Sequence, residues 1–314
     1  MAEDRRPWFK TLLCVRGSVI RAVLPRVGIC TSFALLITLF HNAGISVSWP
    51  VLGGVVPSIV LGLLLVFRTN ASYERFWEGR KLWGNIVNTS RNLARQIWVS
   101  VDTSRHSKER ALKLLVAYAI AMKQHLRQQP CQQELTHLVT SAQLNQLTGM
   151  NSPPLEIAFW LGDYLKEQQL KGRINPYQLQ AMTQQVNSMV DSLGGCERIL
   201  KTPLPLAYSI HLKQLLVMYC LALPFQVVSE LNLWTVPVVA LVAFAVFGVE
   251  EIGLEIENPF GCDPNDLPLN AICQAMERNI QDLITLTPSI EKKEQQPWQI
   301  TTLLPVGNEK QNIE

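Results

Sequence analysis

The chain has 314 residues, a net charge of +3 and a hydrophobic fraction of 48%. The small net charge, without a basic stripe interleaved with aromatic residues, argues against nucleic acid as a partner. Mean hydropathy is only +0.12, but the apolar residues are concentrated in four runs that are separated by polar chain. This uneven distribution favours one membrane domain with a soluble extension over two soluble domains.

The reactive residue types form no recognisable chemical site. The seven cysteines include no CxxC pair, which argues against a disulfide framework or a zinc centre. The five histidines share no metal-ligand spacing, and the motifs of serine hydrolases, phosphate-binding loops and dinucleotide sites are absent. We therefore expect a protein that is not an enzyme and has no cofactor, with a membrane enzyme of unfamiliar type as the minor alternative.

Residues 1–26 are predicted to form a basic amphipathic segment at the membrane surface. The first apolar run, 27–45, supplies the roughly twenty residues that a membrane-spanning helix needs, and Pro25 is suited to open that helix. Because the run is long and starts late, we expect a retained anchor rather than a cleaved signal peptide. A second run, 49–67, completes a first transmembrane hairpin over residues 27–67.

The second run contains a proline that predicts a helix start inside the membrane. Pro57 removes a backbone donor, so we expect a break near Val55 or Val56 and a fresh helix N-terminus at Pro57 and Ser58. The positive end of the helix dipole at that depth is suited to hold an anion.

The apolar second run passes directly into polar chain at Arg68. No Pro or Gly interrupts residues 63–77, which predicts one helix that leaves the bilayer and continues into water. Ile59, Leu63 and Phe67 lie at i, i+4 and i+8, on one side of this helix. From periodicity alone, packing against lipid or another helix is the simpler interpretation, and lining a narrow apolar pore is the alternative.

Residues 68–203 are predicted to form a helical cytosolic domain, because no alternating run long enough for a strand occurs there. Pro and Asn punctuation divides it into five expected helices, at 70–99, 107–129, 132–147, 154–170 and 176–201.

Residues 204–253 are predicted to form a second transmembrane hairpin. Its third span, 204–228, is expected to be interrupted at Pro224, and its fourth span covers 235–253. Lys and Arg precede the first run and follow the second, which places both termini in the cytoplasm. Glu250, Glu251 and Glu255 at the end of the fourth span are interpreted equally well as a cation-attracting ring or as partners of the basic first segment.

The remaining chain divides into a cytosolic C-terminal motif and helix, 254–286, and a loose polar tail, 287–314. Asp266 or Asn270 is suited to cap the last helix, expected at about 269–286. Asp263 and Asp266 are a weak metal-site candidate, for which capping and turn formation are the simpler interpretation.

Three separated motifs resemble the bestrophin family, in its bacterial branch. They are FRTNASYERFWEGRKLWG at 67–84, CERILKTPLPLAYSIHLKQLL at 196–216 and ENPFGCDPNDLPL at 257–269. They occur in the family's order, and the similarity extends over nearly the whole chain to about Leu286.

The resemblance implies an all-α integral membrane protein, with four transmembrane helices per subunit that continue into a helical cytosolic domain, assembled as a homopentamer around one pore. By the same resemblance, Ile59, Leu63 and Phe67 would form the pore neck, and Tyr177 would form a second, cytosolic constriction. Animal members hold calcium in an acidic run after the NPFG motif. Here that run is reduced to Asp263, Asn265 and Asp266, which puts calcium binding in doubt.

The sequence and the resemblance together predict a channel that passively conducts small monovalent anions of the chloride type. The expected partners are further copies of the chain, the lipid membrane and small inorganic ions, and the expected location is the cell (inner) membrane as a multi-pass protein. A cation-selective channel of the same fold and a non-conducting membrane scaffold are the two alternatives.

Overall fold

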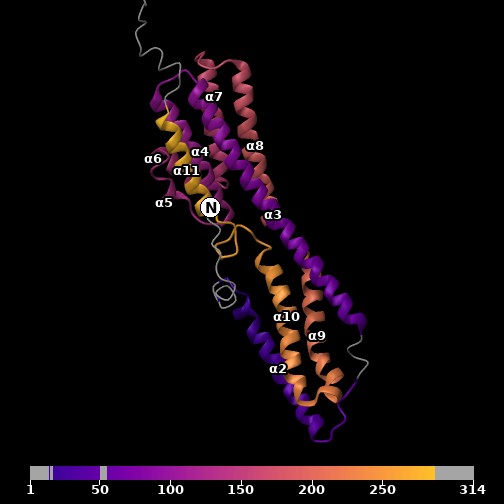
Figure 1. The fold of residues 1–314 in the computed structure, drawn as a ribbon. Coiled ribbons are helices and arrows are strands. Elements are labelled where there is room, and N and C mark those ends of the chain that lie inside the picture. Colours follow the sequence, from indigo (N-terminus) through magenta and orange to yellow (C-terminus); the bar gives the residue numbers. More distant parts are fainter. Residues whose placement is uncertain (1–13, 15–16, 50–54, 287–314) are drawn as a thin grey trace, which may run out of the picture.

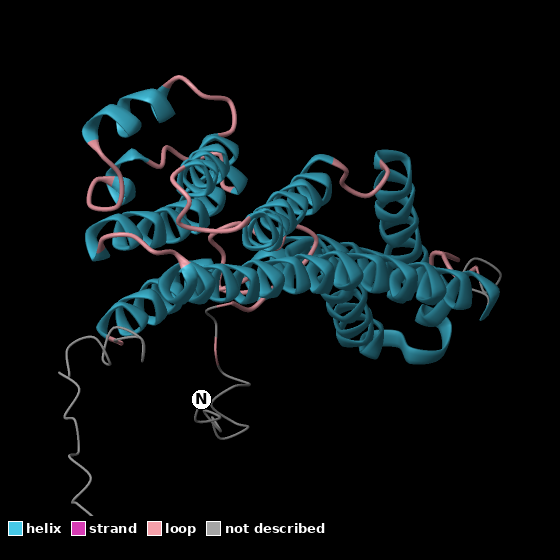
Figure 2. Cartoon of the chain, turned by 90° about the horizontal axis from the view of Figure 1, so that it is seen from above, coloured by secondary structure: helices cyan, strands magenta, loops and turns pink. Residues whose placement is uncertain are grey.

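The structure, a computed structural model, describes residue 14 and residues 17–49 and 55–286. Most of the predicted segment 1–26, the start of the second apolar run at 50–54 and the predicted tail 287–314 therefore lie outside the described residues. Within the described residues every regular element is a helix, and Figure 2 shows helices and loops only. The expectation of an all-helical fold is confirmed for this part of the chain.

The helices follow one another with short connections, and α9 is joined to α10 by a 3₁₀ turn, η2. Their bounds are α2 Ile20–Asn42, α3 Val55–Ser100, α4 Arg105–Leu126, α5 Gln132–Leu135, α6 Ser141–Thr148, α7 Pro153–Leu170, α8 Pro176–Lys201, α9 Leu206–Leu231, η2 Asn232–Trp234, α10 Thr235–Glu255 and α11 Leu269–Thr285.

The molecule is elongated along α3, which runs through both of its halves (Figure 1). This helix has 46 residues, and at 1.5 Å per residue it is roughly 70 Å long. The first part of α3 packs with α9 and α10, which together with α2 form what we call the apolar half, and the rest packs with α4, α8 and α11 in the polar half. The prediction of one uninterrupted helix through Arg68 is confirmed, because the sequence there contains no helix breaker.

The apolar half exposes large apolar side chains on its outside, as a membrane-embedded surface does. Three helical segments of the described chain are long and apolar enough to cross a membrane: Ile20–Asn42, Val56–Ser100 and Leu206–Glu255, the last of which contains both α9 and α10. Exposed apolar residues on these segments include Ile29, Leu36, Leu39, Val217, Met218, Leu241 and Phe244. An outer surface of this kind is stable in lipid and would be costly in water.

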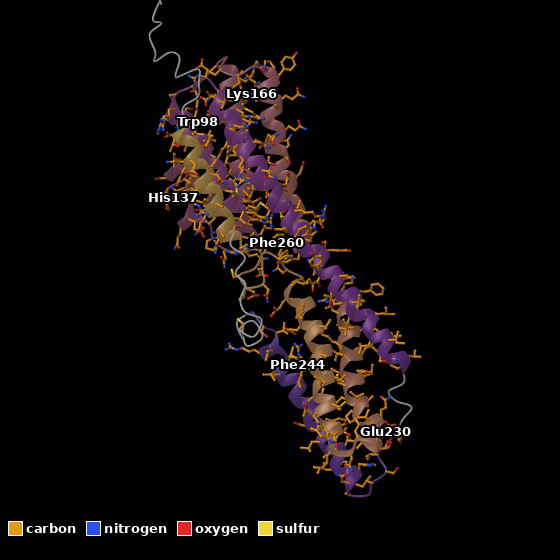
Figure 3. The ribbon with its side chains drawn as sticks, viewed as in Figure 1. Trp98, His137, Lys166, Glu230, Phe244 and Phe260 are labelled. Atoms are coloured by element: carbon orange, nitrogen blue, oxygen red, sulfur yellow. The ribbon has the colours of Figure 1, made fainter. Side chains whose placement is uncertain are left out.

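The polar half is built around a continuous apolar core formed by α3, α4, α7, α8 and α11. Trp83 and Tyr118 are fully buried in this core. The helices are delimited by local signals that sequence reasoning can use, such as the capping box at the start of α8, where Asn175 and Gln178 bond each other's backbone N–H groups. In Figure 3, the labelled Phe260 lies where the two halves meet.

One expected helix, 132–147, is wrong. The structure has two short helices there, α5 and α6, separated by residues 136–140. The reason is a capping box, because the Thr140 side chain accepts a hydrogen bond from the backbone N–H of Gln143 and the Gln143 side chain bonds the Thr140 backbone in return. This local bonding starts a new helix at Ser141.

Three expectations at helix ends also need correction. Pro25 does not open the first helix but lies inside α2, which starts at Ile20, and Pro224 lies inside an α9 that continues past it. A single proline removes only one backbone hydrogen bond, and the apolar surroundings of these helices favour helical backbone on both sides of it. The N-cap of α11 is Pro268, without a side-chain cap, because Asp266 and Asn270 bond other groups.

Candidate functional site

The three predicted neck residues lie on one exposed face of α3 in the apolar half. Ile59, Leu63 and Phe67 are 56%, 53% and 63% exposed, whereas Leu61 and Leu65 on the other side of the helix are buried against the apolar half. Packing within the chain is therefore ruled out as their role. Their side chains are available to lipid, to another subunit or to a pore.

The same face continues as a polar stripe for most of the remaining length of α3. At helical spacing after Phe67, the exposed residues on this face are Asn70, Glu74, Trp77, Lys81, Asn88, Asn92 and Arg95. We call this face, from Ile59 to Arg95, the α3 stripe. Sequence reasoning missed its polar part, although the i, i+4, i+7 spacing continues without a break and could have revealed it.

The predicted anion-facing residues lie at the outer end of the α3 stripe. Val55 and Val56 are already helical, so α3 begins at or before Val55 and not at Pro57 as expected, and Pro57 lies in its first described turn. Pro57 is exposed and Ser58 is half-buried, and the two residues directly precede Ile59. The structure thus places Pro57, Ser58 and the three neck residues together at one end of one helix.

Arg68 fixes α3 at the boundary between the two halves. Its side chain is only 2% exposed and points away from the α3 stripe. One guanidinium nitrogen lies 2.6 Å from Glu257 Oε2 and another donates to Ser209 Oγ at 3.1 Å. A second carboxylate oxygen of Glu257 accepts from the backbone N–H of Leu204 at 2.9 Å. The pair therefore joins α3 to the start of α9 and the end of α10.

The carboxylates at the end of α10 have partners. Arg26 Nη1 lies 3.3 Å from Glu250 Oε2 and 2.7 Å from Glu251 Oε2. Glu255 accepts a hydrogen bond from the amide of Asn265. Glu250 and Glu251 are also buried. Of the two interpretations that the sequence left open, pairing with the basic first segment is the one found for Glu250 and Glu251.

Tyr177 lies far from the neck residues, in the first turn of α8 and 83% exposed. Just before α8, Arg173 donates to Thr103 Oγ1 at 2.8 Å and its carbonyl accepts from the backbone N–H of Asp102. These contacts place the start of α8 beside the C-terminal end of α3. The structure does not bring Tyr177 together with the neck and instead sets it at the opposite end of the long helix.

Asp263 and Asp266 lie in the turn before α11, and their bonds are those of a structural turn. Asp266 Oδ2 accepts from the backbone N–H of Asp263 at 2.7 Å, and burial raises the pKa of the Asp266 carboxyl above its usual range. The Asn265 amide donates to Glu255 and to the Gly17 carbonyl. Among the described residues, no group of three or more His, Cys, Asp or Glu side chains is placed to hold a metal ion.

Comparison with known proteins identifies close relatives of the whole arrangement. The model of one protein family, described as Bacterial/Fungal Bestrophin protein, matches residues 1–282. A voltage-dependent anion channel-forming protein of Nostoc sp. is 57% identical over 294 residues, which cover 92% of this chain and 96% of that protein. The Synechocystis sp. protein of the same name is 55% identical, and the match covers 91% of this chain and 95% of that protein. The Escherichia coli K12 protein of the same name is 30% identical, and the match covers 88% of this chain and 91% of that protein.

Solved structures share the fold. The crystal structure of a bacterial bestrophin homologue from Klebsiella pneumoniae is 27% identical to this chain, with a TM-score of 0.78, and the match covers 85% of this chain and 100% of that one. The overall fold of the chain is thus one that is known from experiment.

Proposed function

This chain belongs to the bacterial and fungal bestrophin family, and from that membership and the geometry of α3 we propose that it forms a homopentameric membrane channel that passively conducts small monovalent anions through one central pore. Each subunit would contribute four transmembrane helices, α2, the first part of α3, α9 and α10. The names of the relatives from Nostoc sp., Synechocystis sp. and Escherichia coli, all anion channel-forming proteins, support the anion as the permeant ion.

The observation that carries the proposal is the α3 stripe. A helix that is packed on one side along its whole length and exposed on the other has a free face, which a ring of subunits would turn toward a common axis. In such a ring, Ile59, Leu63 and Phe67 form a narrow apolar neck, and the stripe continues inward with amides and the cations Lys81 and Arg95, against one acid, Glu74. Dipoles and cations of this kind suit a partly hydrated anion.

The carboxylates near the membrane boundary support anion over cation selectivity. Glu250 and Glu251 share the single guanidinium of Arg26, and Glu257 pairs with Arg68, so each of these carboxylates has a guanidinium within 3.3 Å. An ion-paired, buried carboxylate attracts a passing cation far less than a free one. The argument from Glu250 and Glu251 for a cation-selective channel is therefore weakened, whereas the Glu255 side chain is bonded, within the described part of the chain, only to the uncharged amide of Asn265.

Two further elements complete the proposed pathway. At the outer mouth, Pro57 and Ser58 would present the positive end of the α3 dipole to an incoming anion. At the other end, Tyr177 would form the cytosolic constriction. The distribution of Lys and Arg supports a cytoplasmic location for the polar half and both termini, and the proposed location of the channel is the cell (inner) membrane.

The turn at Asp263 and Asp266 does not fit a calcium site well. Calcium prefers six to eight oxygen ligands, whereas Asp266 Oδ2 already accepts a backbone N–H and the Asn265 side chain is engaged through its amide nitrogen. We therefore propose no calcium-dependent step for this channel.

The test is the reversal potential of the purified protein in a planar bilayer under a potassium chloride gradient. We expect a value near the chloride equilibrium potential. In the Ile59→Ala/Leu63→Ala/Phe67→Ala variant we expect a higher conductance, because smaller side chains widen the neck and let water enter it. Unchanged conductance in this variant would remove the three residues from the pore.

The other outcomes separate the alternatives. A reversal potential near that of potassium would make the cation-selective channel the correct interpretation. Absence of current in both the natural protein and the triple variant would favour the non-conducting scaffold. Mass measurement in mild detergent provides an independent check, since a monomer or dimer leaves no five-fold pore.

A further inference from the structure

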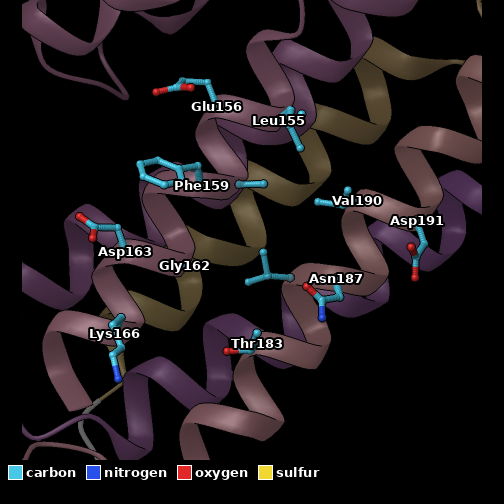
Figure 4. A pocket seen from close by; sticks show the side chains of 12 residues that line it. Leu155, Glu156, Phe159, Gly162, Asp163, Lys166, Thr183, Asn187, Val190 and Asp191 are labelled. Atoms are coloured by element: carbon cyan, nitrogen blue, oxygen red, sulfur yellow. The ribbon is translucent and has the colours of Figure 1, made fainter. Parts of the chain in front are cut away.

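A groove of about 890 Å³ lies between α7 and α8, on the outside of the polar half (Figure 4). Its walls are partly apolar, with Phe159 on α7 and Val190 on α8, and Phe159 is largely exposed. Its lining also includes one cation, Lys166, against three acids, Glu156, Asp163 and Asp191. Asp163 and Asp191, one on each helix, lie along it, and both are exposed without a hydrogen bond or ion pair to any described residue. A partly apolar groove with unpaired acids at its edge is suited to a basic, partly apolar helix.

In the same chain, one edge of α3 has this basic character. Arg80 and Arg91 are exposed, and neither makes a hydrogen bond or ion pair within the described part of the chain. Seen along the helix axis, with about 100° between successive residues, these two arginines flank one side of the α3 stripe. Glu78 and Asn85, which contact α8 of the same chain, flank the other side. We call the side with Arg80 and Arg91 the free edge of α3.

The groove and the free edge lie at the same height along the molecule. Asn85 donates to Ser188 Oγ at 3.0 Å and to Ser192 Oγ at 2.8 Å, and Glu78 lies 2.7 Å from Arg198. The two helices therefore run antiparallel, and the α8 residues of the groove, 183–191, lie level with about residues 85–93 of α3. Rotation about an axis parallel to α3 keeps these heights. In such a ring Arg91 meets the groove at its own level, and Arg80 lies between one and two helical turns from the level of Asp191.

We propose that in the assembled channel the groove between α7 and α8 of each subunit takes the free edge of α3 of the next subunit, with Arg80 and Arg91 facing Asp163 and Asp191. The arrangement is head-to-tail, with two different surfaces, as a cyclic assembly requires. In each subunit, the α3 stripe has α8 of the same subunit on one side and the groove of the neighbouring subunit on the other. The stripe itself therefore stays open to the central axis. This inference rests on the proposed pentamer and adds the identity of its contact surfaces.

Cross-linking tests the contact directly. In a background with the exposed Cys262 changed to Ser, the variant Arg91→Cys/Asp163→Cys is treated with a short bismaleimide in detergent. We expect a ladder of covalent species up to five subunits, which neither single variant gives. The pair Arg278→Cys/Asp163→Cys, with its first cysteine exposed on α11, is the matched control and should give no ladder.

Charge reversal gives a second readout. We expect Arg80→Glu/Arg91→Glu to lower the pentamer fraction at least twofold, and the added exchange Asp163→Arg/Asp191→Arg to restore it. Arg278→Glu should leave the fraction unchanged. A pentameric mass without a ladder and without sensitivity to these charges would overturn this interface and leave the proposed channel standing. A chain that is never pentameric would overturn both.

Discussion

Single residues hold the two halves of the molecule together, and Arg68 is the clearest case. Its guanidinium is buried, and its carboxylate partner Glu257 also accepts a backbone N–H from Leu204. Two charges that are removed from water stabilise a fold only while they neutralise each other. The first arginine of the FRTNASYERFWEGRKLWG motif therefore has a structural role at the junction, with its side chain away from the α3 stripe.

We predict that Arg68→Met destabilises the protein by about 3 kcal/mol, because it leaves the Glu257 carboxylate, whose side chain is only 14% exposed, without a counter-charge. The measurement is thermal unfolding of the purified protein in detergent. The double variant Arg68→Met/Glu257→Gln should recover part of the loss, since it removes the orphaned charge. Arg278→Met serves as the control for an exposed arginine and should unfold like the natural protein. A double variant no more stable than Arg68→Met would contradict the pairing argument.

At the scale of elements, the packing of α8 on α3 depends on one glycine. A Cβ atom at Gly195 would lie 2.8 Å from Leu82 Cδ1 on α3, whereas a Cβ atom at the adjacent Gly194 meets nothing within 4 Å. The two glycines are neighbours in one helix and differ only in the face on which they lie. They form a matched pair for measuring the value of this close approach.

We predict that Gly195→Ala destabilises the protein by up to about 1 kcal/mol, because the Leu82 side chain must shift to avoid overpacking. Gly194→Ala should stabilise it by up to about 1 kcal/mol, since alanine favours helix over glycine. Thermal unfolding of both variants checks this directly. The added change Leu82→Ala should relieve the clash at Gly195. If both alanine variants unfold at the same temperature, α8 does not approach α3 as closely as described.

Several elements were predictable from sequence because their signals are local. The continuity of α3 across Arg68 follows from the absence of Pro and Gly at residues 63–77, and the start of α8 follows from Asn175 before a proline. The break between α5 and α6 was missed because a Thr140 capping box competes with an otherwise helical pattern, and its strength depends on side-chain geometry. Pro25 was misplaced because a proline ends a helix in some surroundings and is tolerated in others.

The candidate site was predictable only in part, for a physical reason. The spacing of Ile59, Leu63 and Phe67 places them on one side of a helix, but only the tertiary structure shows that this side is exposed along most of α3. Arg26 and Glu250 are 224 positions apart in the sequence, so no local pattern joins them. Contacts of this kind depend on how α2 and α10 pack together, which periodicity does not encode.

At the scale of the whole molecule, the proposed pathway has two narrow points in series. The level of Tyr177 is that of the C-terminal end of α3, about 33 residues beyond Phe67, which at 1.5 Å per residue is roughly 50 Å. When two constrictions lie in series, the one with the higher resistance to ion flow determines most of the total resistance. The apolar neck must both dehydrate an ion and exclude water, so we expect it to limit conduction in the natural protein.

We predict that Tyr177→Ala changes the single-channel conductance little in the natural protein but raises it about twofold or more in the Ile59→Ala/Leu63→Ala/Phe67→Ala background, where the neck no longer limits ion flow. Planar bilayer recordings of the four proteins measure this coupling. Leu170→Ala is the control, because Leu170 is another exposed apolar residue at the C-terminal end of α7, near the start of α8. An equal rise in both backgrounds would mean that the two points do not act in series. No effect in either background would remove Tyr177 from the ion pathway and leave the neck as the constriction that the α3 stripe supports.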